Sequence, residues 1–132
     1  MMNELTLWDE GISVGNELLD EQHRQAYEML RAATRVLSDS APSISHFHGY
    51  LEYFLSFLEL HFASEEAILA KNACPSLAAH KMEHDSMLEA LRELRLAAMG
   101  GTIDNARLLE FMSDLVCRHV PEVDVPLKDY MR

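Results

Sequence analysis

Apolar residues recur along the chain in alternating steps of three and four positions, the spacing of an α-helix that buries one face. Two segments of the first half carry this pattern: Leu19, His23, Ala26, Leu30, Ala33, Leu37 and then Phe47, Leu51, Phe54, Leu58, His61, Glu65, Ile68. Two segments of the second half carry it as well: Leu77, His80, His84, Met87, Leu91, Leu94, Ala98 and then Leu108, Met112, Leu115, His119. The pattern therefore predicts four amphipathic helices.

Short breaker sequences separate these segments. They occur at residues 38–42, at residues 72–75 and at Gly100-Gly101, and Thr102 is a plausible N-cap for the last helix. An N-terminal arm of about 15 residues, which contains Trp8, precedes the first helix. Helices joined by short turns favour neighbours that run in opposite directions. We therefore predict an all-α protein, an antiparallel up-down-up-down four-helix bundle with an N-terminal arm, as one domain over residues 1–132.

Composition narrows the classes of partner. The chain has 132 residues, of which 48% are hydrophobic, and its 22 Asp and Glu against 11 Lys and Arg give a formal charge of −11. Such a surface repels nucleic acid and anionic lipid headgroups, so we expect neither as a partner. The apolar runs are too short to span a bilayer, and the first residues lack the pattern of a secretory signal. We therefore expect a cytoplasmic protein, in which Cys74 and Cys117 stay reduced.

Histidines occupy apolar positions of the predicted helices, where a bundle otherwise places leucine or methionine. Five of the seven histidines do so, and Glu65 joins them one helical turn after a histidine. A buried carboxylate without a partner costs several kcal/mol, and buried imidazole nitrogens also need partners. One inward histidine is usually a satisfied core residue, whereas this set needs a common partner. We therefore predict a metal site that includes His23, His61, Glu65, His80, His84 and His119.

The spacing within two helices supports this prediction. His80 and His84 are four residues apart, and His61 and Glu65 have the same separation, so each pair projects from one helix face. Either pair alone is a weak signal, because such spacings are common by chance. Their joint placement in one layer of a bundle is a strong signal.

A second carboxylate is predicted from the end of the fourth helix. Asp124 follows His119 by five residues, which on a regular α-helix turns it about 140° away. Pro121 disfavours helical geometry at the preceding residue and has no N–H, so we expect the helix to bend or end there. By itself the position favours a surface residue. Beside the other six candidates, Asp124 is the missing carboxylate of the site.

At this point the sequence resembles the hemerythrins, specifically the single-domain bacteriohemerythrins. The resemblance covers essentially the whole chain, and all seven ligand positions of the family are filled. It rests on Trp8 and the following motifs: Ser13-Val14-Gly15, Asp20-Glu21-Gln22-His23, His61-Phe62-Ala63-Ser64-Glu65-Glu66, His80-Lys81-Met82-Glu83-His84 and His119-Val120-Pro121-Glu122-Val123-Asp124.

The resemblance implies a centre of two iron ions with an oxo or hydroxo bridge. One iron would be bound by three histidines and have no free position, and the other by two histidines, which leaves a position open for dioxygen. Glu65 and Asp124 would bridge both ions. The function implied is reversible dioxygen binding for storage or delivery, by a monomer that is not an enzyme and that supplies an oxygen-consuming recipient protein. The two groups of histidines are His80, His84 and His119, and His23 and His61.

Three other functions stay open. A di-iron peroxidase or oxidase shares the metal, but the Glu-x-x-His motif of ferritin-like proteins is absent from this chain. An oxygen or iron sensor would need a separate partner. A mononuclear zinc protein fits poorly, because seven candidate ligands exceed the usual four and HExxH is absent.

Some positions depart from the family's usual residues without removing a ligand. Other polar residues could bind metal but are not needed for the predicted site, and we call them the spare candidates. The departures affect the surroundings of the site and hence the lifetime of an oxygen adduct. They are Leu115, Met87, Cys74 and Leu127. For the spare candidates Glu122, His46 and His48 we expect exposed positions.

Overall fold

The computed structural model describes residues 12–38 and 44–132. Trp8, most of the expected N-terminal arm and the breaker residues 39–42 lie outside the described residues. Within the described part, the elements are α1 (Glu17–Leu37), α2 (Ile44–Lys71), α3 (Leu77–Met99), α4 (Asn105–Asp114), the π-helix η3 (Leu115–Asp124) and the 3-10 helix η4 (Val125–Tyr130).

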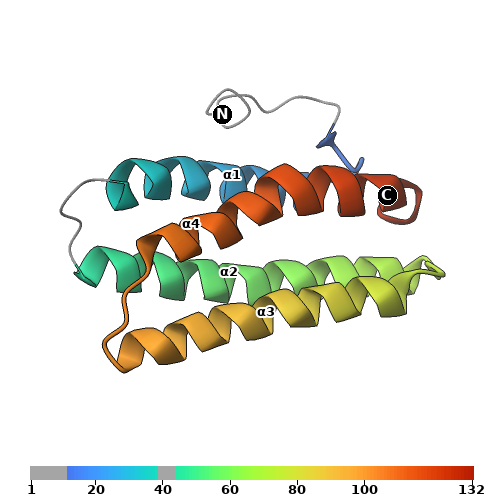
Figure 1. Cartoon of the computed structure of the whole chain (residues 1–132). Helices are drawn as coiled ribbons and strands as arrows, with labels where there is room; N and C mark the ends of the chain where they lie inside the picture. Colours follow the sequence, from blue (N-terminus) through green and yellow to red (C-terminus); the bar gives the residue numbers. More distant parts are fainter. Residues whose placement is uncertain (1–11, 39–43) are drawn as a thin grey trace.

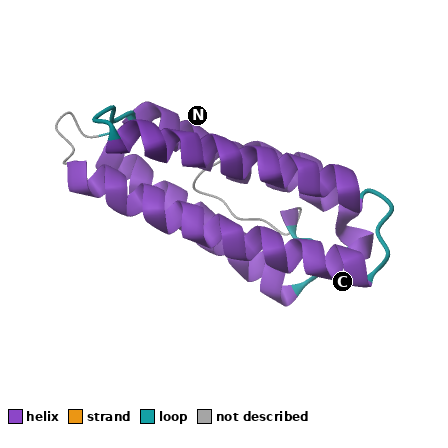
Figure 2. Ribbon diagram, turned by 90° about the horizontal axis from the view of Figure 1, so that it is seen from below, coloured by secondary structure: helices purple, strands orange, loops and turns teal. Residues whose placement is uncertain are grey.

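Successive helices run in opposite directions, and α4 continues directly into η3 and η4 (Figure 1). The helix pairs α1 and α2, α2 and α3, and α1 and α4 pack against each other, and α3 also contacts α4. The predicted all-α bundle is therefore confirmed. Seen from below, the four helices lie nearly parallel to one long axis (Figure 2). None of the described helices has a stretch both long and apolar enough to cross a membrane.

The core fills the space between the four helices along most of their length. Phe47, Phe54 and Phe62 of α2 are fully buried, and they pack with leucines of all four helices. Burial of one such side chain contributes about 1.5–3 kcal/mol relative to exposure, so these three rings anchor α2 firmly in the core. Leu115 is fully buried in this core and Met87 is half-buried against it.

The fourth helix starts later than the sequence indicated. Asp104, and not Thr102, is its N-cap, and the Asp104 carboxylate accepts a hydrogen bond of 3.0 Å from the backbone N–H of Arg107. Both residue types are good caps, but an acidic side chain also interacts favourably with the positive end of the helix dipole. The prediction of Thr102 as the cap was therefore wrong by two residues.

A second apolar cluster closes the end of the bundle where the chain terminates. Two amides hold the terminal segment there: Asn16 donates to the backbone oxygen of Met131 at 2.7 Å, and Asn72 donates to that of Tyr130 at 2.7 Å. These contacts fix the segment that follows Asp124 against α1 and α2. The cluster comprises Val14, Leu19, Leu69, Cys74 and Met131, with Leu127 packed against it.

Candidate metal centre

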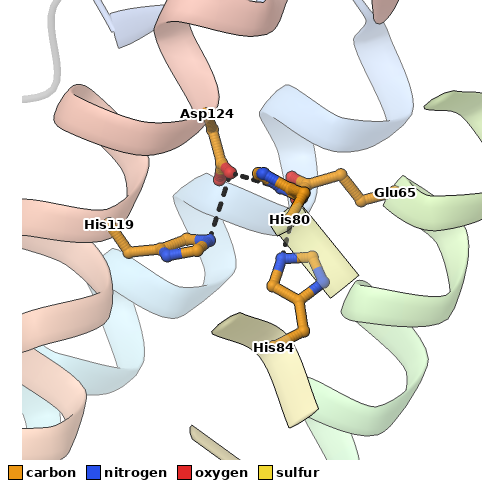
Figure 3. A group of neighbouring side chains, drawn as sticks. All are labelled: Glu65, His80, His84, His119 and Asp124. Carbon is orange, nitrogen blue, oxygen red and sulfur yellow. Dashed lines mark hydrogen bonds and ion pairs between the residues drawn. The ribbon is translucent and has the colours of Figure 1, made fainter. Parts of the chain in front are cut away.

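The structure brings together all seven side chains that the sequence singled out. Each is at most 4% exposed, although each is polar. They form two overlapping sets of candidate ligand atoms, with all atoms of a set within 4.8 Å of one another. The first set, shown in Figure 3, is Glu65, His80, His84, His119 and Asp124. The second set is His23, His61, Glu65 and Asp124.

We call His80, His84 and His119 the three-histidine group, and His23 and His61 the two-histidine group. The two groups come from different helices. α1 carries His23 and α2 carries His61, whereas α3 carries His80 and His84, and η3 carries His119. The carboxylates Glu65 and Asp124 belong to both sets and therefore lie between the groups.

The π-helix η3 explains how Asp124 reaches the centre. A π-helix closes its hydrogen bonds over five residues, and the N–H of Val125 indeed bonds to the carbonyl of Val120. His119 and Asp124, five positions apart, therefore lie on one side, with 3.1 Å between His119 Nε2 and Asp124 Oδ1. Pro121 lies inside η3. The chain does not end its helix at Pro121, one of the two outcomes expected from the sequence; it stays helical and widens into a distorted, π-helical segment.

The two oxygens of Glu65 face different groups of histidines. Oε1 lies 2.6 Å from His80 Nε2 and 3.1 Å from His84 Nε2. Oε2 lies 3.5 Å from His23 Nε2 and 3.7 Å from His61 Nε2. One carboxylate thus presents one oxygen to each group.

Asp124 divides its oxygens in the same way. Oδ1 lies 3.1 Å from Nε2 of both His80 and His119, and Oδ2 lies 3.3 Å from His23 Nε2. Both carboxylates are therefore arranged as bridges between two positions, with nitrogen atoms around each position.

Most of these inward-facing atoms lack a hydrogen-bond partner within the described residues. Leaving a buried polar atom unpaired costs about 1–3 kcal/mol, so a cluster of them requires another partner. Imidazole nitrogens and carboxylate oxygens together suit divalent metals such as iron, so the donor set fits the predicted cofactor. The unpaired atoms are Nε2 of His23, His61, His84 and His119, Oε2 of Glu65, and both carboxylate oxygens of Asp124.

Three histidines are oriented from behind through Nδ1. Donation of the Nδ1 proton to an oxygen leaves the Nε2 lone pair of the neutral ring free for a metal. Each acceptor is the immediate sequence neighbour of a candidate ligand on its own helix, yet it serves a histidine on the next helix. The pairs are His61 with Gln22 Oε1 at 2.7 Å, His84 with Glu66 Oε2 at 2.8 Å, and His119 with Glu83 Oε2 at 2.8 Å.

From the sequence, these three acceptors were named only as members of motifs and were assigned no role. Their signal is a polar residue directly beside a ligand position, as Gln22 stands beside His23 and Glu66 beside Glu65. Which histidine each one serves depends on the packing of neighbouring helices. These hydrogen bonds link α1 to α2, α2 to α3 and α3 to η3. No such bond links η3 back to α1, because His23 Nδ1 has no partner among the described residues.

Without metal, the centre attracts protons. Burial lowers the pKa of His80, but its contacts with Asp124 and Glu65 outweigh burial and raise the pKa to about 10. The same balance raises the pKa of His23 to about 9. At His61 burial prevails over the attraction of Glu65 and lowers the pKa to about 4. A field that holds protons on two buried imidazoles also favours metal cations.

Aromatic and aliphatic side chains enclose the centre. The ring of Phe62 stacks on that of His84 at a centroid distance of 3.8 Å and an angle of 3°. Phe57 stacks on His61 at 5.7 Å and 9°. Leu19 and Leu58 are fully buried nearby on the helices that carry the two-histidine group. This shell keeps bulk water from the polar cluster.

The spare candidates lie outside the centre. Glu122 and His46 are exposed, as expected, and neither belongs to a candidate ligand set among the described residues. His48 is half-buried, so the expectation of an exposed position was wrong there. Its ring lies edge-on to that of its neighbour Phe47, with centroids 5.7 Å apart.

Comparisons with known proteins point to one family. The family model of the Hemerythrin HHE cation binding domain matches residues 14–125. The Bacteriohemerythrin of Methylococcus capsulatus is 29% identical over 117 residues, which cover 86% of this chain and 85% of that protein. The Bacteriohemerythrin of Ralstonia nicotianae is 30% identical over 118 residues, covering 89% and 82%.

More distant relatives agree as well. The Myohemerythrin of Sipunculus nudus is 25% identical over 122 residues, covering 92% of this chain and 90% of that protein. A crystal structure of a hemerythrin mutant superimposes with a TM-score of 0.84 at 23% identity and covers 95% of both chains. At that identity the likeness shows the fold.

Proposed function

Because this chain belongs to the hemerythrin family, we propose that it binds dioxygen reversibly at two non-haem iron ions, for oxygen storage or delivery. The proposal includes the ligands. His80, His84 and His119 would hold one iron, and His23 and His61 the other. Glu65 and Asp124 would each give one oxygen to either ion, and a solvent-derived oxo or hydroxo group would complete the bridge.

The observation that carries this proposal is the division of the carboxylate oxygens. Oε1 of Glu65 and Oδ1 of Asp124 face the three-histidine group, whereas Oε2 and Oδ2 face the two-histidine group. With a bridging oxygen, the first position has six donors and the second has five. An iron with an open coordination position supplies electrons and a binding place for a small ligand such as dioxygen.

The protein's own residues would protect that position. Reversible binding requires that protons and outside reductants stay away from the bound ligand. Leu19 lies one helical turn before His23, Leu58 lies one turn before His61, and Phe57 stacks on His61. All three side chains are buried, and none can donate a proton. The Nδ1 of His61 is held by the neutral amide of Gln22, so no carboxylic acid stands behind this histidine.

Other parts of the proposal rest on the sequence. They are a monomeric cytoplasmic protein of one domain over residues 1–132, and a separate oxygen-consuming protein as recipient. We propose no enzymatic role, because the carboxylates of the centre are engaged by histidines and would be committed to metal.

The test is absorbance of the reduced, iron-loaded protein during alternating equilibration with oxygen and nitrogen. We expect colour on oxygenation and bleaching on removal of oxygen over several cycles, with metal-free protein colourless throughout. Hydrogen peroxide is assayed in parallel and should stay far below one equivalent per chain.

The opposite result would be stoichiometric release of peroxide with permanent oxidation on the first exposure, which would overturn the carrier function. Rapid consumption of added peroxide in the presence of a reductant would then favour the di-iron peroxidase or oxidase. Iron analysis of the same samples separates this outcome from a failure to bind metal, because the proposal requires about two irons per chain.

A further inference from the structure

A cavity of about 280 Å³ lies between the start of α3 and the end of η3. Among the proposed ligands it touches His80 alone. Two other surface cavities, one beside Met29 on α1 and one beside Gly49 on α2, touch none of the seven ligands. The lining residues of the first cavity are Ser76, Ala79, His80, Glu83, Glu122, Val123 and Leu127. We call it the His80 cavity.

His80 stands between this cavity and the centre. The residue is only 4% exposed, and its Nε2 lies 2.6 Å from Glu65 Oε1 inside the centre. In His61, His84 and His119, Nδ1 is held by a side chain of the neighbouring helix. His80 Nδ1 has no such partner within the part of the chain that the structure describes. The Nε2 of this buried imidazole thus faces the centre, and its Nδ1 has no protein partner among the described residues.

Two carboxylates share the wall of the His80 cavity. Glu83 Oε2 accepts from His119 Nδ1 at 2.8 Å and from Arg118 at 3.0 Å, while its other oxygen has no partner among the described residues. Burial raises the pKa of Glu83, but the contacts with His119 and Arg118 outweigh burial and lower it, so this carboxylate is ionised. Glu122 is exposed at the same wall. The cavity therefore presents carboxylate oxygens, which are ligands of divalent cations, and it adjoins a histidine of the centre.

The size of the cavity suits a hydrated ion. At roughly 30 Å³ per water, a volume of about 280 Å³ holds about nine waters, which is enough for a cation with most of its hydration shell. The formal charge of −11 attracts cations from solution toward such a site. Dioxygen is the poorer occupant, because the cavity adjoins the three-histidine group, where the proposed donors leave no position open.

We propose that the His80 cavity is a binding site for a hydrated divalent cation, through which iron reaches the centre. This inference rests on the proposed di-iron function. Glu122 and Glu83 bind the incoming ion through carboxylate oxygens, and His80 forms the passage between the cavity and the bridging carboxylates.

The experiment follows anaerobic uptake of Fe²⁺ by metal-free protein in a stopped-flow instrument, with final iron per chain measured separately. Glu122→Lys should slow uptake by about tenfold, because it places a positive charge at the wall. Glu122→Gln should slow it less. Ala79→Trp, which fills the cavity without a change in charge, should also slow uptake. All three variants should finally bind as much iron as the parent protein, because no proposed ligand is changed.

The matched control is Glu89→Lys, an exposed position on α3 outside the cavity that gives the same change in net charge. It should take up iron at nearly the parent rate. Equal slowing by Glu89→Lys and Glu122→Lys would mean that the overall negative charge of the protein, and not this cavity, attracts the iron, and it would overturn the proposal. Parent-like rates in both Glu122→Lys and Ala79→Trp would overturn it as well. If the parent protein itself binds no iron, the proposed function fails first, so the two failures are distinguishable.

Discussion

The two halves of the centre share their carboxylates but differ in what supports their histidines. In the three-histidine group, the carboxylates of Glu66 and Glu83 accept the Nδ1 protons of His84 and His119. In the two-histidine group, the neutral amide of Gln22 serves His61, and no described residue serves the Nδ1 of His23.

This difference has a direct consequence for metal binding. A carboxylate behind an imidazole increases the electron density on the opposite nitrogen, whereas an amide does so less. The three-histidine group also has one nitrogen more. We therefore expect it to bind metal first and more tightly, while the two-histidine group binds more weakly and keeps an open position. We therefore expect the three-histidine half to hold its metal firmly and the two-histidine half to offer the open coordination position.

The largest effect is expected from the residue that both halves share. Replacement of Glu65 by Ala removes one oxygen from each position and leaves Asp124 as the remaining carboxylate between the facing imidazoles. Iron per chain should fall from about two to well below one, because a carboxylate ligand of each position is lost at once. The measurement is elemental analysis of purified protein, beside circular dichroism to confirm that the helices are formed.

Glu59→Ala is the control, since Glu59 is an exposed glutamate of the same helix that pairs with Arg92 on the surface. Such a pair contributes about 0–1 kcal/mol, so this variant should keep its iron. Normal iron content in the Glu65 variant would mean that the two halves do not share this carboxylate.

A smaller effect is expected from an exchange of the supporting groups. Glu83→Gln gives His119 a neutral partner and should weaken the first, tight binding step about 10–100-fold. Gln22→Glu gives His61 a carboxylate partner and should strengthen the second, weaker step. Titration of metal-free protein with Co²⁺, followed by absorbance, resolves the two steps.

The double variant, with Glu83→Gln and Gln22→Glu together, sharpens the comparison. It should bring the two affinities closer than either single variant does. If Glu83→Gln weakens both steps equally and Gln22→Glu changes neither, the supporting groups do not set the difference between the halves.

The sequence was sufficient for the fold and for the members of the candidate centre. Helical periodicity reveals a polar residue on an apolar face directly, because such a residue violates the pattern that its own helix must keep. His23, His61 and Glu65 could be found in this way without knowledge of the neighbouring helices. Asp124 could be placed in the centre only together with the others, since a regular helix would turn it away.

Features that depend on packing between helices could not be predicted. Gln22, Glu66 and Glu83 lie beside the apolar stripes, and the partner of each belongs to another helix. The π-helix around Pro121 adds a local hydrogen-bond pattern for which sequence periodicity has no signal. The error at Thr102 arose because two residues that can cap the helix, Thr102 and Asp104, lie close together in the sequence.

The smallest effect concerns the stability of the metal-free protein and contrasts His80 with His61. The pKa of His80 is raised to about 10 in the folded state, above its ordinary value of 6.5. The protonated ring therefore stabilises the fold fully below pH 6.5, and this stabilisation is lost as the pH rises toward 10. The pKa of His23 is raised to about 9 and adds to this loss. The pKa of His61 is lowered to about 4, so its neutral form contributes above pH 6.5 and stability is lost as pH falls toward 4.

We therefore expect the metal-free protein to be most stable near pH 6–7 and to melt on the order of 10 °C lower at pH 10. Calorimetry from pH 5 to pH 10 tests this. His80→Gln should flatten the alkaline side of the profile, because it removes the group that releases its proton there. His61→Gln should flatten the acid side instead. Iron-loaded protein should lack most of the alkaline loss, since metal replaces the protons on these nitrogens. A melting temperature of the metal-free protein that rises from pH 7 to pH 10 would contradict the raised pKa values, and identical profiles for the two variants would remove this distinction between the halves.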